Sequence, residues 1–141
     1  MLKGISPLLP PELLKLLAEM GHGDELVIGD SNFAAASLSR AVVRCDGNRA
    51  TEMLDAILQL FPLDVFVETP VILMRADPGF MDGDPPIWDE FKAIVEKHQP
   101  GTKCGDISRF EFYDRTRKAY ATVATTESQA FGCIIIRKGC C

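Results

Sequence analysis

The feature that most constrains the fold is the alternation of amphipathic segments with short apolar runs along the chain. Leucines at helical spacing predict a helix over residues 10–20, which two prolines begin and Gly21 ends. The same spacing predicts helices over residues 49–61 (with Asn48 as the N-cap) and 87–98, and Ser108 with Glu111 at capping-box spacing predicts a fourth helix over residues 108–120. Apolar runs predict strands at residues 25–30, 41–45, 64–75, 120–125 and 131–139, with Pro70 splitting the third run or placing it at a sheet edge. Alternation of this kind favours an α/β fold, so we expect one three-layer domain over residues 1–141, with a mainly parallel central sheet flanked by helices.

Charge and hydropathy argue against two classes of partner. The 141-residue chain has a net charge of -5, and its basic residues are scattered, so nucleic acid is not an expected partner. No apolar run is long enough to span a bilayer, and prolines with Glu12 interrupt the early leucines, so neither membrane insertion nor a signal peptide is indicated. We expect a cytoplasmic protein.

The chain has no familiar cofactor motif. Its five cysteines show no C-x-x-C spacing, which argues against a zinc site or a disulfide framework. The sequences G-x-G-x-x-G, G-x-x-x-x-G-K-[ST] and G-x-S-x-G are absent, and so are the histidine spacings of zinc hydrolases. We therefore expect no metal and no nucleotide cofactor.

His22 is the strongest candidate for chemistry. It lies between Gly21 and Gly23, where a predicted helix ends and a predicted strand begins. Glycines let the backbone turn tightly and leave space for a ligand beside the imidazole. A histidine at a helix C-terminus, capped by Gly21, is also a common structural choice. The pattern alone leaves both interpretations open.

Asp30 and Arg109 are weaker candidates. Asp30 follows the strand after His22, where a carboxylate can line a cleft, form a turn or cap a short helix over residues 32–37. Arg109 begins a predicted helix, where the helix dipole disfavours a cation unless the side chain reaches an anion, a polyhydroxyl ligand or water. His98, at a helix end, is interpreted as a surface residue.

Four motifs together resemble the L-fucose mutarotase family, the sister group of D-ribose pyranase. They are "GHGDE" at residues 21–25, an aspartate after the next strand, "RFEFY" at residues 109–113 and "FGCIIIRKG" at residues 131–139. The combination is far more specific than any single motif, and the resemblance covers most of the chain, being weakest between residues 80 and 106.

The resemblance implies a sugar mutarotase that interconverts the α and β anomers of a free aldose such as L-fucose, without metal or nucleotide. It implies that His22 transfers protons, that Asp30 and Arg109 bind the sugar, and that Phe131, Gly132 and Cys133 form a further substrate segment. It also implies pentameric rings that can pair into a homodecamer, with each site completed by a neighbouring subunit.

The substrate segment departs from the family pattern at two positions. Family members usually carry Tyr and Asn where this chain has Phe131 and Cys133, so a hydroxyl and an amide are missing. Tyr120 is a candidate to compensate for them. These departures keep two alternatives open: a sugar-binding or transport-associated protein with little catalysis, and a pyranase acting on D-ribose.

Overall fold

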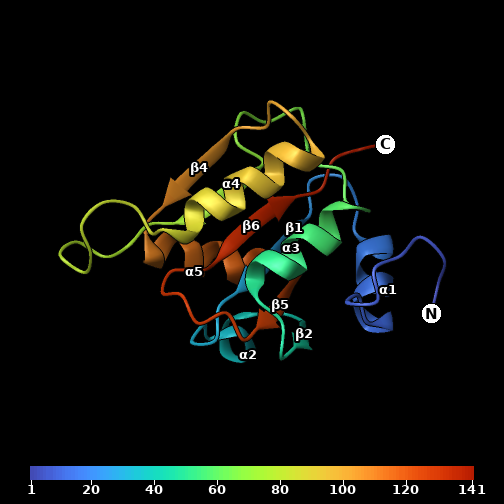
Figure 1. Cartoon of the computed structure of the whole chain (residues 1–141), viewed down its shortest axis with the longest axis horizontal. Coiled ribbons are helices and arrows are strands. Elements are labelled where there is room, and N and C mark those ends of the chain that lie inside the picture. The colour runs from blue at the N-terminus through green and yellow to red at the C-terminus, as the bar shows by residue number, and fades with distance from the viewer.

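A six-stranded sheet forms the centre of the molecule. The computed structural model describes all residues, 1–141, and its sheet has the strand order β2-β5-β1-β6-β3-β4 (Figure 1). The strands are β1 (Glu25–Gly29), β2 (Val42–Cys45), β3 (Val71–Met74), β4 (Cys104–Ile107), β5 (Ala121–Thr125) and β6 (Ile134–Arg137). β6 runs antiparallel to both of its neighbours, and every other pairing is parallel. The mainly parallel sheet is therefore confirmed, with β6 as its one reversed strand.

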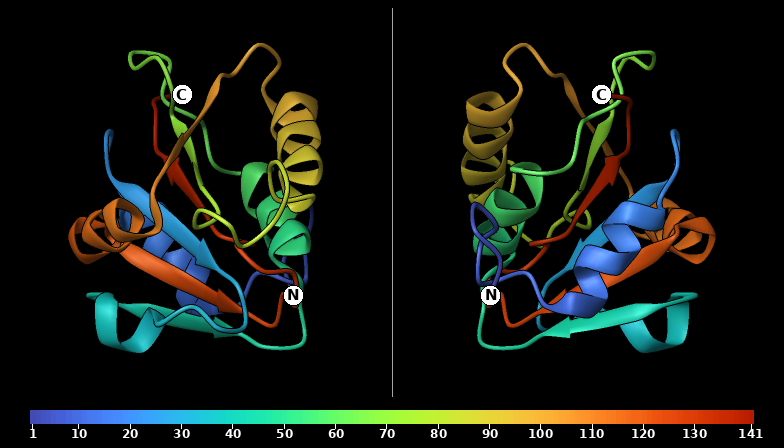
Figure 2. Two further views of the ribbon diagram at one scale, coloured as in Figure 1. Left: turned by 90° about the vertical axis from the view of Figure 1, so that its left-hand side faces the viewer. Right: turned by 90° about the vertical axis from the view of Figure 1, so that its right-hand side faces the viewer.

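Helices cover both faces of the sheet. They are α1 (Pro11–Glu19), α2 (Ala35–Leu38), α3 (Ala50–Leu58), α4 (Ile87–His98) and α5 (Arg109–Lys118). Figure 2 shows α3 and α4 on one side of the sheet and α5 on the other. This confirms the expected three-layer α/β domain.

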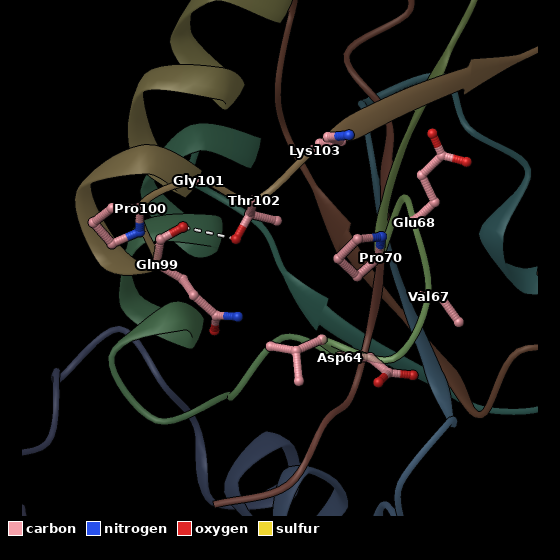
Figure 3. Close-up of a pocket in the computed structure, with 10 residues that line it drawn as sticks. Asp64, Val67, Glu68, Pro70, Gln99, Pro100, Gly101, Thr102 and Lys103 are labelled. Atoms are coloured by element: carbon pink, nitrogen blue, oxygen red, sulfur yellow. Dashed lines mark hydrogen bonds between the residues drawn. The ribbon is translucent and has the colours of Figure 1, made fainter.

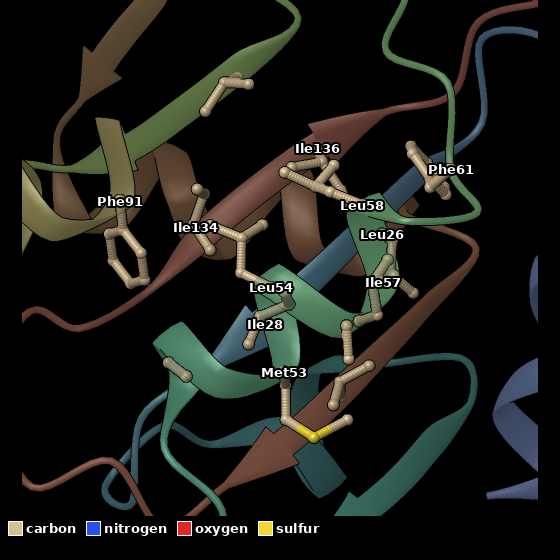
Figure 4. Close-up of a cluster of buried hydrophobic side chains, with 14 of the residues drawn as sticks. Leu26, Ile28, Met53, Leu54, Ile57, Leu58, Phe61, Phe91, Ile134 and Ile136 are labelled. Atoms are coloured by element: carbon tan, nitrogen blue, oxygen red, sulfur yellow. The ribbon is translucent and has the colours of Figure 1, made fainter. Parts of the chain in front are cut away.

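The two faces of the sheet bury very different amounts of apolar surface. Alternate residues of each strand point to opposite faces, so Leu26 and Ile28 of β1 face one side while Val27 faces the other. The first side holds a cluster of 26 buried residues under α1, α3 and α4, and the second holds 7 under α5. Figure 4 shows Leu54 and Ile57 of α3 packed toward β6 and β1 within the larger cluster. Burial on both faces explains why these strands are continuous apolar runs rather than alternating ones.

The predicted strand over residues 64–75 is mostly wrong. Only Val71–Met74 forms a strand, and residues 65–68 form bends that leave Val65 and Phe66 exposed. Pro70 has no backbone N–H to donate to a ladder, so the sheet begins after it. The first half of this apolar run is thus a surface segment.

The sequence does not predict strand β4. β4 carries Gly105 and Asp106 and has no fully buried residue, because it pairs only with β3 at the edge of the sheet. An edge strand with one ladder partner does not need the apolar pattern that identifies a central strand.

Helix ends also differ in detail from expectation. Asn48 is not the N-cap of α3, because its side chain donates to the carbonyl of Cys45 instead. Arg49 occupies the cap position, and its backbone N–H donates to Glu52 Oε2 at 2.7 Å. At the end of α1, Lys138 Nζ donates to the carbonyls of Leu17 and Met20, so a lysine from the far end of the chain caps this helix. No helix in the chain combines the length and the apolar character needed to cross a membrane.

Candidate active site

β1 has a predicted functional residue at each of its ends. Asp30 follows the carboxyl end of β1, and His22 precedes the amino end. β6 runs antiparallel to β1 with Ile28 opposite Ile134, so the segment just before β6 lies beside Asp30. Residues 131–133 and Asp30 are therefore neighbours although about a hundred positions separate them.

The Asp30 carboxylate is held by this segment. Its Oδ2 accepts from the backbone N–H of Gly132 at 3.2 Å and from Cys133 Sγ at 3.4 Å, and its Oδ1 accepts from the N–H of Asn32 at 3.0 Å. Burial raises the pKa of the Cys133 thiol well above its ordinary value, and the nearby Asp30 raises it further, so the sulfur keeps the proton it donates. Since a carboxylate has about four acceptor sites, roughly one remains for a ligand hydroxyl.

Gly132 and Phe131 have unusual backbone requirements. A Cβ on Gly132 would lie 2.8 Å from the carbonyl oxygen of Gln129, so the close turn before β6 requires glycine. Phe131 has a φ of 58°, in the left-handed region that bulky residues rarely occupy. Its ring packs edge-on against Phe80, with centroids 5.1 Å apart. The segment thus has a constrained shape beside Asp30.

Arg109 reaches the same place from the start of α5. Ser108 caps that helix by accepting from the N–H of Glu111. Arg109 Nε donates to both carboxylate oxygens of Asp77, at 2.9 and 3.1 Å, and Nη1 donates to the Tyr113 hydroxyl at 3.4 Å. The Asp77 carboxylate offsets the unfavourable interaction between the Arg109 cation and the helix dipole. About three of the five N–H donors of Arg109 remain free.

Asp30, Arg109, Phe131 and Cys133 line one small pocket. It has a volume of about 190 Å³, and Phe33, Phe80 and Tyr113 contribute aromatic surface. A carboxylate acceptor, guanidinium donors and aromatic walls suit a small ligand that carries both hydroxyl groups and an apolar ring face. The structure thus brings together the binding residues that the sequence predicts.

His22 lies outside this pocket. β1 rises by about 3.3 Å per residue, so its five residues put about 16 Å or more between His22 and Asp30. His22 Nε2 lies 3.1 Å from Asp64 Oδ1, and its ring contacts that of Phe66 at a centroid distance of 5.6 Å. A single chain therefore does not bring the predicted proton-transfer residue to the predicted binding residues.

Two other candidates are also far from the pocket. Tyr120 directly precedes β5, which is parallel to β1, so it lies at the His22 end, where its hydroxyl donates to Glu19. Within one chain it lies away from Phe131, so its role in compensating for the missing hydroxyl stays a prediction. His98 is only 15% exposed and pairs with Asp55 at 2.7 Å, so it is less of a surface residue than predicted.

The sequence does not predict the roles of three carboxylates that are buried or paired in the structure. Asp64 and Glu127 are each 1% exposed, and Asp77 pairs with Arg109. Glu127 binds Arg49 and accepts from the N–H of Gln129, so it anchors the loop that leads to Phe131. Each of the three lies in a loop, where charged residues are usually solvated, and no pattern in the sequence marks them as buried or paired.

A larger hollow lies at the His22 end. Figure 3 shows the segment from Asp64 to Pro70 on one side of it and the turn from Gln99 to Lys103 on the other. Its volume is about 370 Å³, and polar or loop residues form most of its lining. No group of three or more His, Cys, Asp or Glu side chains in the chain is arranged to hold a metal ion.

Comparison with known proteins identifies the family of this chain. The chain is 47% identical to the L-fucose mutarotase of Actinobacillus pleuropneumoniae serotype 5b over 140 residues, covering 99% of this chain and 96% of that one. It is 43% identical to the human fucose mutarotase, covering 98% and 93%. The crystal structure of the Streptococcus pneumoniae fucose mutarotase in complex with L-fucose superposes with a TM-score of 0.92 at 42% identity, covering 99% of both chains. The model of the RbsD / FucU transport protein family matches residues 3–141. The predicted resemblance is confirmed, and the chain belongs to the RbsD / FucU family.

Proposed function

We propose that this protein is a sugar mutarotase that interconverts the α and β anomers of L-fucose or a related free aldose. The observation that carries the proposal is the convergence of Asp30 and Arg109 on one small aromatic-walled pocket. The proposal is supported by the relatives, which are fucose mutarotases at 43% and 47% identity, and by the fucose complex of a protein with the same fold.

The reaction needs proton transfer rather than a strong nucleophile. The anomeric hydroxyl loses its proton, the bond between C1 and the ring oxygen breaks, and the ring oxygen gains a proton. Rotation about the C1–C2 bond then presents the other face of the aldehyde, and the same steps run in reverse. An imidazole titrates near neutral pH, so it serves both directions.

We assign His22 as the general acid and base, and Asp30 and Arg109 as ligands of sugar hydroxyls. Phe131 and Cys133 supply an apolar wall and the contact that fixes Asp30. Gly132 contributes its backbone N–H to the same carboxylate. The assignment requires no metal and no nucleotide.

Because His22 and Asp30 lie at opposite ends of β1, we propose that each site is completed by His22 of the partner subunit. We propose a head-to-tail contact, which joins two different surfaces and forms a ring when the rotation between neighbouring subunits closes. Pentameric rings that pair into a decamer fit that requirement.

Exposed apolar side chains support such a contact. Val65 and Phe66, beside His22, are 74% and 76% exposed. Phe80 and Phe110, beside the pocket, are 61% and 66% exposed. Large aromatic side chains left in water on two separate surfaces are typical of protein contacts. Joining these two surfaces buries both pairs and places an imidazole at the pocket.

We also propose a cytoplasmic location. All five cysteines are free, and three of them are buried or half-buried. Unpaired cysteines are typical of proteins kept in a reducing compartment.

The proposal is tested by saturation-transfer NMR between the anomer signals of a sugar panel: L-fucose, D-galactose, D-arabinose and D-ribose. We expect enzyme-dependent exchange that is fastest with L-fucose or a close relative. Sugar binding without added exchange would instead identify a binding protein. Preferential conversion between the pyranose and furanose forms of D-ribose would identify a pyranase.

A further inference from the structure

Asp64 is a buried carboxylate that the proposed reaction does not yet use. Its side chain is 1% exposed, and it lies on the surface segment that follows Pro62. Oδ1 accepts from the N–H of Phe66 at 2.9 Å and contacts His22 Nε2 at 3.1 Å. Oδ2 accepts from Arg137 Nε at 2.9 Å. A carboxylate with so many partners in a loop requires an explanation beyond solvation.

The position of Asp64 does not depend on His22. The backbone N–H of Asp64 donates to the carbonyl of Arg137 at 3.0 Å, and the N–H of Gly139 donates to the carbonyl of Pro62 at 2.8 Å. The side-chain amide of Gln99 bonds both backbone groups of Leu63. These bonds hold the segment against the end of β6 and against Gln99, and none of them involves the imidazole.

The contact determines which imidazole nitrogen carries the proton. Bonds from Phe66, Arg137 and His22 hold the pKa of Asp64 below its usual range, so the carboxylate is ionised and only accepts hydrogen bonds near neutral pH. His22 Nε2 must therefore carry hydrogen, which leaves Nδ1 as the nitrogen with a free lone pair. The other charged groups around this corner include Arg137, which also holds Asp64, and Asp24, which accepts from the N–H of Gly21. Lys138 is also close, since its Nζ donates to the carbonyl of Met20.

We propose that Asp64 is a positioning residue for the mutarotase reaction: it holds His22 in the Nε2–H tautomer and presents Nδ1 as the proton acceptor. The role rests on the proposed function, in which His22 transfers protons. It does not require Asp64 to touch the sugar or to change its own protonation. Orienting carboxylates of this kind stabilise both the reactive tautomer and the imidazolium that forms after proton uptake.

The chain contains a matched control. Its second histidine, His98, contacts Asp55 through Nε2 at 2.7 Å, on α4 and α3 away from the pocket. The two pairs use the same atoms, but only His22 is assigned to the reaction. With only two histidines in the sequence, their ring signals are separable by comparing single variants.

The test combines long-range ¹H–¹⁵N NMR of the histidine rings with steady-state anomer exchange. In the unmodified protein we expect His22 to show the Nε2–H tautomer. Asp64→Asn should shift the His22 signals toward mixed tautomers and leave those of His98 unchanged, while Asp55→Asn should do the reverse. Asp64→Asn should lower kcat about 10- to 100-fold with little change in KM, and Asp55→Asn should leave both constants unchanged.

Three results would overturn the proposal: a His22 proton on Nδ1 in the unmodified protein, unchanged His22 signals in Asp64→Asn, or unchanged kcat in a variant whose tautomer has shifted. The first measurement needs no variant, so it stands even if Asp64→Asn does not fold. The ring signals do not depend on turnover. If the protein shows no anomer exchange, the proposed function is refuted, and the NMR result on the tautomer of His22 can still be judged on its own.

Discussion

The two ends of β1 are equipped for different tasks. At the carboxyl end, Asp30 and Arg109 surround a pocket that has hydrogen-bonding groups and aromatic walls but no histidine. At the amino end, His22 is 44% exposed beside a fixed carboxylate, with exposed apolar neighbours and no sugar-binding arrangement. One end is suited to hold a sugar and the other to move a proton. The difference supports the proposal that each end is one half of a site, and that a second copy of the chain joins the two halves.

The largest expected effect is the loss of anomer exchange when the His22 imidazole at the amino end of β1 is removed. His22→Ala should lower the anomer-exchange rate by roughly 10² to 10⁴, since it removes the positioned acid and base. L-fucose binding should persist, because the pocket residues are untouched. NMR exchange gives the rate, and titration calorimetry gives the affinity. A variant with unchanged activity would show that His22 has no role in the reaction.

Mixing variants tests whether the half-sites belong to different subunits. His22→Ala and Asp30→Ala should each be nearly inactive, whereas oligomers refolded from an equal mixture should regain roughly a quarter of the sites, because that share pairs an intact His22 with an intact pocket. Refolding each variant alone is the control. If the mixture stays inactive while both variants assemble, the two-subunit site is wrong.

The substitution Glu127→Gln should destabilise the loop that leads to the pocket and leave His22 unchanged. This change leaves Arg49 facing a neutral side chain at a buried position, which should cost about 1–3 kcal/mol of unfolding free energy. The matched control is Glu90→Gln, since Glu90 also pairs with Arg49 but is 43% exposed, and its loss should cost less than about 1 kcal/mol. Urea denaturation measures both. Equal losses would mean that burial of Glu127 has no special importance for the loop.

The smallest effect concerns acid stability at the amino end. The pKa of Asp64 is lower in the folded protein than its ordinary value, so its stabilisation is complete above the unfolded pKa of about 3.9 and is lost as pH falls through the folded pKa. The urea midpoint of the unmodified protein should therefore fall more steeply below about pH 4 than that of Asp64→Asn. Parallel pH curves for the two proteins would contradict this expectation.

Prediction succeeded where a residue's role depends on its own segment. Four helices have the expected type and approximate limits, because apolar residues repeat at helical spacing in three of them and a capping box marks the start of the fourth. The sequence does not predict β4, because an edge strand needs no apolar pattern. It wrongly predicts a strand at residues 64–68, because the exposed Val65 and Phe66 resemble the apolar residues of a buried strand. Exposed apolar residues on a surface segment and buried ones in a strand look alike in a sequence.

For the site, the sequence determined which chemical groups are present and in which loops they lie. His22, Asp30, Arg109 and the segment from Phe131 to Cys133 were all identified by residue type, local pattern and family resemblance. Only the tertiary structure decided which of them meet. The antiparallel course of β6 brings Gly132 and Cys133 to Asp30, and the length of β1 separates His22 from all three. The same register places Arg137 and Asp64 at the His22 end, because distances across a sheet depend on strand direction and pairing, which no local pattern specifies.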